Sequence, residues 1–230
     1  MKFLKCLILI IIIVVYIYEG TCHAITQDKL IGCLCGIHSI DTANYSRQLG
    51  MENIEMLPNI LLIPSGHPLA RHNAMSILNT ARYVKAFPNE RFLSIMLNQI
   101  KNIRLYTSED EIEFELNYID SLISFMSYIP WQGATCSLDE NYSNADLIIT
   151  QMKEHDLIKN NGIKNSLAKK YENSLKSLKK GNKTPAINIL EAAKNEINAQ
   201  SGKSIDTTAA SILVRYTDNL IAHINSTNQY

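Results

Sequence analysis

The sequence predicts an all-α protein, with an N-terminal helical region packed against a small C-terminal helical module. Along most of the chain, apolar residues recur at alternating spacings of three and four, which places them on one face of a helix. Residues that start or end helices separate these stretches. No sustained two-residue alternation of apolar and polar residues occurs, so a sheet is not expected.

Size and charge limit the classes of function. With 230 residues, 46% of them hydrophobic, the chain can bury a sizeable core. Residues 25–152 carry 14 acidic and 8 basic side chains, whereas residues 153–230 carry 7 acidic and 12 basic ones. Opposite charges on two parts of a chain can hold the parts together or present two distinct surfaces. The net charge of zero argues against nucleic-acid binding.

The first 24 residues have the features of a secretory signal. Lys2 and Lys5 precede an apolar run from Cys6 to Tyr18, and a small-residue pattern ends at Ala24. This run is too short to span a bilayer, because a spanning helix needs about 20 residues. We therefore expect export to a secreted or periplasmic location with cleavage near Ala24, and no membrane span after signal removal. An uncleaved N-terminal helix that anchors the protein is the alternative, and a lipidated Cys33 is less favoured.

The N-terminal region is taken as residues 25–152. After an irregular or partly helical entry segment, three apolar stripes predict helices: Ala70, Ala74, Ile77, Ala81 and Val84; Phe92, Met96, Ile100 and Ile103; Ile112, Leu116, Ile119, Ile123 and Met126. Ser108 and Glu111 form a capping box before the third stripe. A further helix is expected from about Asn144 to Asn160, ended by Asn161-Gly162.

The C-terminal module, residues 153–230, is predicted to contain three helices. Their apolar faces are Leu167, Tyr171, Leu175 and Leu178; Ile187, Leu190, Ala193 and Ile197; Ala209, Ile212, Leu213, Tyr216 and Leu220. Gly181-Asn182 and Gly202 separate them. Thr184 is expected to cap the second helix, with Pro185 at its first position, and Asp206 is expected to start the last one.

Part of this module resembles a known family. The segments concerned are Gly162-Ile163, Asn165-Ser166-Leu167, Gly181-Asn182, Ala186-Ile187-Asn188, and Asn198 to Lys203. In their order and spacing, residues 162–224 resemble the FIMAH-type domain, a short helical module near the C-terminal ends of many secreted bacterial and archaeal proteins. Ala193 and Lys194 depart from the large aromatic and aliphatic residues expected there. The resemblance implies an exported, accessory role, because no catalytic residues are associated with the module.

Three cysteines remain after cleavage at Ala24: Cys33, Cys35 and Cys136. In an oxidising compartment we expect Cys136 to pair with Cys33 or Cys35, which leaves one thiol over. Alternatively, Cys33, Cys35 and His38 can bind zinc or copper. A fourth ligand is not apparent, so we predict no metal and no cofactor.

The closest approach to a catalytic motif is Ser65-Gly66-His67, where a serine precedes a histidine at a turn. A helix start before Pro68 explains the same residues more simply. We therefore assign no catalytic residues, and a small exported hydrolase that uses Ser65 and His67 is the alternative. His67 and His72 point in different directions on a helix, so they are not expected to bind a metal together.

Lys169, Lys176 and Lys180 lie on one helix face, opposite the Leu167 to Leu178 stripe. They can contact an anionic cell-envelope polymer or the acidic N-terminal region, although a solvated face is the default. Trp131 can stack on a sugar or close a helix core. Together these features favour a non-catalytic accessory or interaction module that binds a protein or a cell-envelope component.

Overall fold

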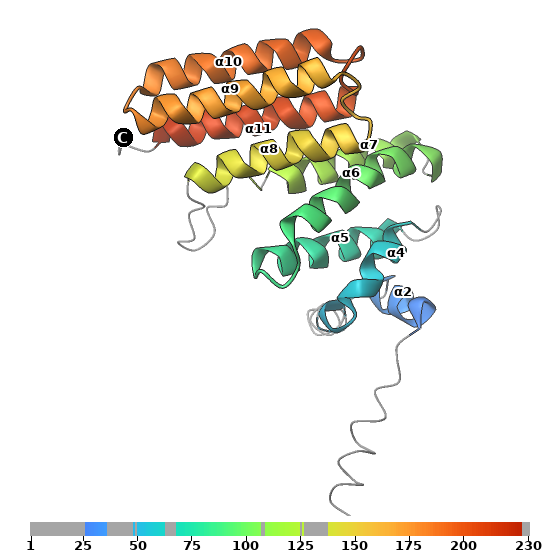
Figure 1. Cartoon of the computed structure of the whole chain (residues 1–230). Helices are drawn as coiled ribbons and strands as arrows, with labels where there is room; N and C mark the ends of the chain where they lie inside the picture. Colours follow the sequence, from blue (N-terminus) through green and yellow to red (C-terminus); the bar gives the residue numbers. More distant parts are fainter. Residues whose placement is uncertain are drawn as a thin grey trace, which may run out of the picture.

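A computed structural model describes residues 26–35, 48, 50–62, 68–106, 109–124, 126 and 138–226. The prediction of an all-α fold is confirmed: the described residues form helices, turns and two isolated bridges. The N-terminal helices lie along one side of a C-terminal bundle whose helices run side by side (Figure 1). The buried residues of both parts form one continuous hydrophobic cluster.

The N-terminal region contains α2 (Gln27–Cys35), the short 3₁₀ helix η1 (Ile54–Met56), α4 (Leu57–Leu61), α5 (Pro68–Tyr83), α6 (Asn89–Tyr106) and α7 (Glu109–Ser124). The described part of the entry segment is therefore helical. Helices α2 and α4 both pack against α5, and the Asn73 side chain of α5 donates a hydrogen bond of 2.7 Å to the Leu34 carbonyl at the end of α2. The capping residue Ser108 lies outside the described residues.

The predicted face of α5 is buried except at its last member. Ala70, Ala74 and Ala81 are fully buried, whereas Val84 is 58% exposed, so its predicted burial is wrong. The reason is that Lys85 adopts a left-handed conformation with φ of 59°. The Ala86 N–H then bonds to the Ala81 carbonyl at 2.8 Å and forms a Schellman turn. Helix α5 therefore ends at Tyr83, and Val84 lies just past its end.

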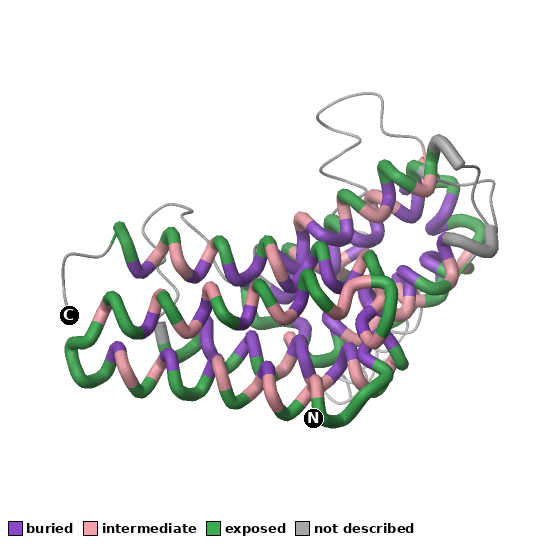
Figure 2. The backbone as a smooth tube through the Cα atoms, turned by 90° about the horizontal axis from the view of Figure 1, so that it is seen from above, coloured by how far each residue is buried: buried purple, intermediate pink, exposed green. Residues whose placement is uncertain are grey.

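The C-terminal part contains α8 (Leu138–Glu154), α9 (Asn161–Lys179), α10 (Lys183–Gln200) and α11 (Thr207–Ser226). Helix α9 packs against both α8 and α10, and α11 packs against α10, α8 and α7. Figure 2 shows buried residues on the facing sides of these helices and exposed residues on their outer sides. Helix α8 also contacts α6, so it lies between the two parts of the chain.

The expected bounds of α8, from about Asn144 to Asn160, are wrong. Helix α8 ends in a Schellman turn at Asp156, whose φ is 57°, where the Leu157 N–H bonds to the Met152 carbonyl at 2.8 Å. Asn160 then caps α9, because its side-chain oxygen accepts a 2.6 Å hydrogen bond from the Gly162 N–H. Asn161-Gly162 therefore begins a helix instead of ending one.

The other two helix starts give one correction and one confirmation. Asn182 occupies the N-cap position of α10, so Thr184 and Pro185 lie inside its first turn and not at the predicted cap and first positions. Asp206 does start α11: its carboxylate accepts hydrogen bonds from the N–H groups of Thr208 (2.8 Å) and Ala209 (3.3 Å).

Direct polar contacts join the N-terminal helices to the C-terminal bundle, as predicted from the fold class. The Asp120 carboxylate of α7 forms an ion pair of 2.9 Å with Arg215 of α11. The Asn219 side chain donates to the Ser124 carbonyl at 3.3 Å. These contacts and the shared core hold α7 against α11. The predicted boundary between residues 152 and 153 falls inside the last turn of α8, so the predicted N-terminal region contains most of this helix, which is grouped here with the C-terminal bundle because it packs on α9.

Small residues fill part of the core between α9, α10 and α11, where Ala193 stands in place of the large aromatic residue expected. Ala193 is fully buried, and so are Ala186 and Ser174, whereas Leu175 of the predicted stripe is only half-buried. The Ser174 hydroxyl donates a 3.0 Å hydrogen bond to the Ala186 carbonyl, which requires a close approach of α9 and α10. Lys194 lies outside this core and bridges Glu191 of α10 and Asp218 of α11, which explains how it replaces an aliphatic residue.

Candidate interaction surface

The outer face of α9 carries the lysines singled out from the sequence. Lys169 and Lys176 are 62% and 57% exposed, and both bond to Glu172, which lies between them. The Lys169 ammonium is 2.8 Å from one carboxylate oxygen, and Lys176 contacts the other. These two hydrogen bonds lower the pKa of Glu172 to about 2. The face therefore carries an exposed lysine–glutamate–lysine clamp on the surface of the bundle.

Lys180 continues this face at the end of α9. It is exposed and precedes Gly181, whose φ of 77° turns the chain towards α10. The neighbouring Lys179 forms a 2.7 Å ion pair with Asp139 at the start of α8. From Asn173 to Leu190 the chain contains four lysines, the fourth being Lys183, and no acidic residue. The end of the bundle at the α9–α10 turn is therefore rich in lysine.

A groove of about 510 Å³ runs between α8 and α9, next to the lysine face. Its rim consists of Asp139, Ser143 and Asp146 from α8 and Asn165, Lys169 and Glu172 from α9. We call it the α8–α9 groove. These rim residues are exposed, and each helix presents them at spacings of three and four, which is the spacing of one helix face.

Buried tyrosines fix the two walls of the groove. The Tyr142 hydroxyl of α8 lies 2.6 Å from the Ser174 hydroxyl of α9, and the Tyr171 hydroxyl lies 2.6 Å from the Thr217 hydroxyl of α11. All four side chains are almost completely buried. Burial raises the pKa of Tyr171 well above its ordinary value, so it stays neutral. Hydrogen bonds between buried groups hold the outer faces of α8 and α9 at a fixed separation.

A serine–histidine contact that the sequence analysis missed joins α6 to the α8–α9 turn. The Ser94 hydroxyl lies 3.1 Å from the His155 ring nitrogen Nε2, and the two residues are 61 apart in sequence. Burial, together with the charge of Lys101, lowers the pKa of His155. Ser94 lies inside α6, where backbone N–H groups bond to carbonyls four residues earlier. These N–H groups are therefore already bonded within α6, and the serine–histidine contact ties α6 to the α8–α9 turn.

His72 lies in an aromatic contact between α5 and α7. Its ring stacks on Tyr118 with centroids 4.1 Å apart, and Phe114 lies 5.9 Å away. Burial lowers the pKa of His72, and the charge of Glu115 partly opposes this. Glu115 itself is held in a buried ion pair with Arg71 at 2.5 Å. The described contacts of His72 are therefore aromatic stacking between α5 and α7.

The remaining predicted site residues fall in two groups. Cys33 and Cys35 are half-buried on α2. The described residues contain no group of three or more His, Cys, Asp or Glu side chains that could hold a metal ion. The second group lies outside the described residues: His38, Ser65, His67, Trp131 and Cys136. The disulfide, the metal site and the hydrolase site that use some of these residues therefore stay predictions.

The N-terminal 25 residues, which carry the predicted signal, also lie outside the described residues. Among the helices that the structure describes, none has both the length and the apolar character needed to cross a membrane.

Comparison with protein families identifies the C-terminal part. Residues 143–222 match the FIMAH domain. This confirms the resemblance found in the sequence. The FIMAH match begins inside α8 and extends to the last turns of α11, so it contains Ser143 and Asp146 of the α8–α9 groove and the whole of α9. No curated protein and no solved structure matches the chain.

Proposed function

We propose that this protein is an exported, non-catalytic interaction module that binds a protein or a component of the cell envelope through the surface of its C-terminal helices. The observation that carries the proposal is the lysine face of α9, formed by Lys169, Lys176 and Lys180, on a helix that buried tyrosines hold in place. A helix whose backbone is held in place suits recognition, because little backbone entropy is lost when its exposed charged side chains bind a partner.

Two features of the sequence support export. Lys2, Lys5 and the apolar run that follows them are typical of a secretory signal. The FIMAH match agrees, because the resemblance implies an exported, accessory protein. We propose a secreted or periplasmic location after cleavage near Ala24, with an uncleaved N-terminal anchor as the alternative.

The charge of α9 favours an anionic envelope polymer as the partner. The lysine face and the lysine-rich α9–α10 turn place positive charge at one end of the bundle. A polymer with repeated negative charges gains attraction from several lysines at once, and this attraction weakens as salt is added. Glu172 reduces the net charge of the face, because it neutralises part of the charge of Lys169 and Lys176.

Retention of the protein on the insoluble envelope fraction of the producing cells tests the proposal. Changing Lys169, Lys176 and Lys180 together to Gln should weaken retention about tenfold, because three charges that face the polymer are lost. Glu172→Gln should strengthen retention, because it releases two lysines. Dextran sulfate should compete for the site, and retention should fall as salt is raised from about 0.05 M to about 0.5 M.

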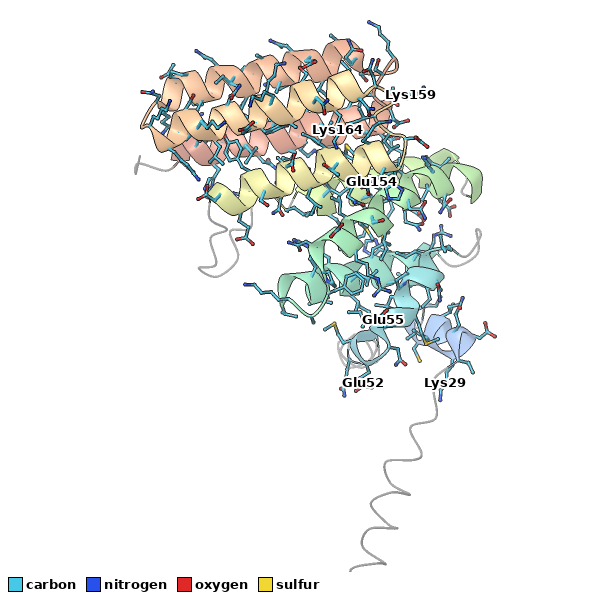
Figure 3. All side chains as sticks on the ribbon, viewed as in Figure 1. Lys29, Glu52, Glu55, Glu154, Lys159 and Lys164 are labelled. Carbon is cyan, nitrogen blue, oxygen red and sulfur yellow. The ribbon has the colours of Figure 1, made fainter. Side chains whose placement is uncertain are left out.

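The chain offers a control with matched charge. Lys159 and Lys164 lie at the other end of α9, near the α8–α9 turn (Figure 3), and Lys203 is exposed in the α10–α11 turn. Changing these three lysines to Gln removes the same charge from a different surface. Equal loss of retention in both triple variants would show that only net charge matters. Retention that resists both triple substitutions and high salt would refute the proposal.

A further inference from the structure

The α8–α9 groove differs in chemistry from the lysine face beside it, because its charges are balanced. Three carboxylates line it: Asp139, Asp146 and Glu172. Three ammonium groups lie on or next to it: Lys169 and Lys176, which bond to Glu172, and Lys179, which bonds to Asp139. A purely anionic or purely cationic ligand therefore gains no net long-range attraction there.

The rim is nonetheless well supplied with hydrogen-bonding groups that face solvent. Asp146 is exposed and forms no ion pair with the described residues. Ser143 and Asn165 are exposed as well, and each can both donate and accept hydrogen bonds. A carboxylate, a hydroxyl and a carboxamide thus surround one groove. They suit a sugar, because each hydroxyl group of a sugar can both donate and accept a hydrogen bond.

The shape and floor of the groove suit the same ligand. Ala168 and Leu175 line it together with Tyr142 and Tyr171, which are themselves only 4% and 2% exposed. This gives a narrow apolar floor between two polar rims, which matches the apolar C–H groups and polar hydroxyls of a sugar ring. The volume of about 510 Å³ lies within the range of ligand pockets. The small side chains of Ser143 and Ala168 leave this space open.

From this arrangement we infer that the α8–α9 groove binds a neutral oligosaccharide. The inference rests on the proposed function in placing the ligand in the cell envelope, but it uses a different physical interaction and mostly different residues, since Lys169 and Glu172 are shared by the two surfaces. The lysine face binds through charge, whereas the groove binds through hydrogen bonds and apolar contact. Binding in the groove therefore depends little on salt.

Calorimetric titration with defined sugars tests the inference. The probes are cellohexaose, laminarihexaose and chitohexaose, which are neutral, with the cationic glucosamine hexamer and an anionic hyaluronan hexamer as comparators. At least one neutral sugar should bind the full chain, with an affinity that changes less than about twofold between about 0.05 M and about 0.5 M salt. Failure of all three neutral sugars to bind, or binding of the charged probes alone, would overturn the inference.

Two variants locate the site. Ser143→Tyr fills the groove, and Asp146→Asn replaces a carboxylate acceptor with an amide at an exposed position that does not threaten folding. Each should weaken binding about tenfold with an unchanged melting temperature. Asn195→Tyr, on the exposed side of α10, is the control for added bulk and should bind as the wild type does. Unchanged affinity in both groove variants would place the sugar elsewhere and overturn the inference.

The triple lysine variant separates this inference from the proposed function. Removing the charges of Lys169, Lys176 and Lys180 should weaken salt-sensitive retention on the envelope about tenfold, whereas the salt-insensitive affinity for the neutral sugar should fall by less than about threefold, since only Lys169 of the three lines the groove. Sugar binding that disappears together with envelope retention would mean that the lysines form the only site, which would overturn the groove as a separate one.

Discussion

A C-terminal fragment that starts at residue 153 should fail to fold, whereas one that starts at residue 138 should fold. The difference between them is α8. One face of α8 carries Tyr142, Ala145, Ile149 and Met152, all of them buried, and Tyr142 bonds to Ser174 of α9. The spacing of three and four places these residues on the side of α8 that faces α9 and α11.

The size of the effect follows from this burial. Ile149 and Met152 are fully buried and Tyr142 nearly so. Burying a large apolar side chain contributes about 1.5–3 kcal/mol, so three of them contribute about 5–9 kcal/mol. The hydrogen bonds from Tyr142 to Ser174 and from the Tyr216 hydroxyl to the Asn141 carbonyl add about 1 kcal/mol each. This total is comparable to the entire stability of a typical domain, about 5–15 kcal/mol.

Urea unfolding of the two fragments, followed by far-ultraviolet circular dichroism, measures the difference. The two faces of α8 provide a matched pair of variants. Ile149→Ala should lower the free energy of unfolding by about 2–5 kcal/mol in both the full chain and the 138–230 fragment. Ile148 lies one residue before Ile149, about 100° round the helix, towards the side of Asn144, whose side chain donates a hydrogen bond to the Met126 carbonyl. Ile148→Ala should therefore destabilise the full chain but have little effect on the fragment.

Three results would contradict this reasoning. The first is cooperative unfolding of the 153–230 fragment with a free energy within about 2 kcal/mol of the longer fragment. The second is an equal effect of Ile148→Ala and Ile149→Ala in the fragment. The third is a 138–230 fragment that does not fold, which would show that α7 also belongs to the cooperative unit through its contact with α11.

Two further predictions concern stability. Lys85→Gly should raise the free energy of unfolding of the full chain by about 0.5–1 kcal/mol, because glycine adopts the left-handed conformation without a steric cost. Lys85→Ala should give no such gain, and equal effects of the two substitutions would contradict this reasoning. Burial raises the pKa of Asp120 above 3.8, more than Arg215 and Ser124 lower it. The stability that this shift contributes is therefore present at low pH and is lost as the pH rises through the raised pKa. Urea unfolding at pH 7, 5 and 4 should show wild type gaining stability relative to Asp120→Asn as the pH falls, and a flat or opposite trend would refute the assignment.

Local sequence signals predicted the helices well, because their spacing reflects a single face. The stripe from Phe92 to Ile103 is buried at every predicted position. Boundaries failed where one residue type has two uses. Asn160 and Gly162 suit a helix end as well as a helix start, and Asp156 gave no sign of the left-handed conformation that ends α8. Only the fold determines which use applies.

The interior of the C-terminal bundle was less predictable, because its polar residues depend on partners in other helices. Ser174 and Thr217 belong to none of the predicted apolar faces, yet both are fully buried, where they bond to Tyr142 and Tyr171. The α8–α9 groove could not be foreseen for the same reason: its rim comes from two helices. The clamp around Glu172 is different, because its lysines are three and four residues away and the pairing rule for helices could have found it.

The position of α8 links binding on the C-terminal surface to the stability of the whole chain. One side of α8 packs against α9. Another side contacts α6, and Asn144 of α8 donates a hydrogen bond to the Met126 carbonyl of the N-terminal region. The rim of the α8–α9 groove lies on the same helix. A ligand that binds only when α8 and α9 are packed together stabilises the folded form by mass action. Because α8 cannot leave α9 without also disturbing α6, the N-terminal region and the FIMAH-matching part should respond to such a ligand as one cooperative unit.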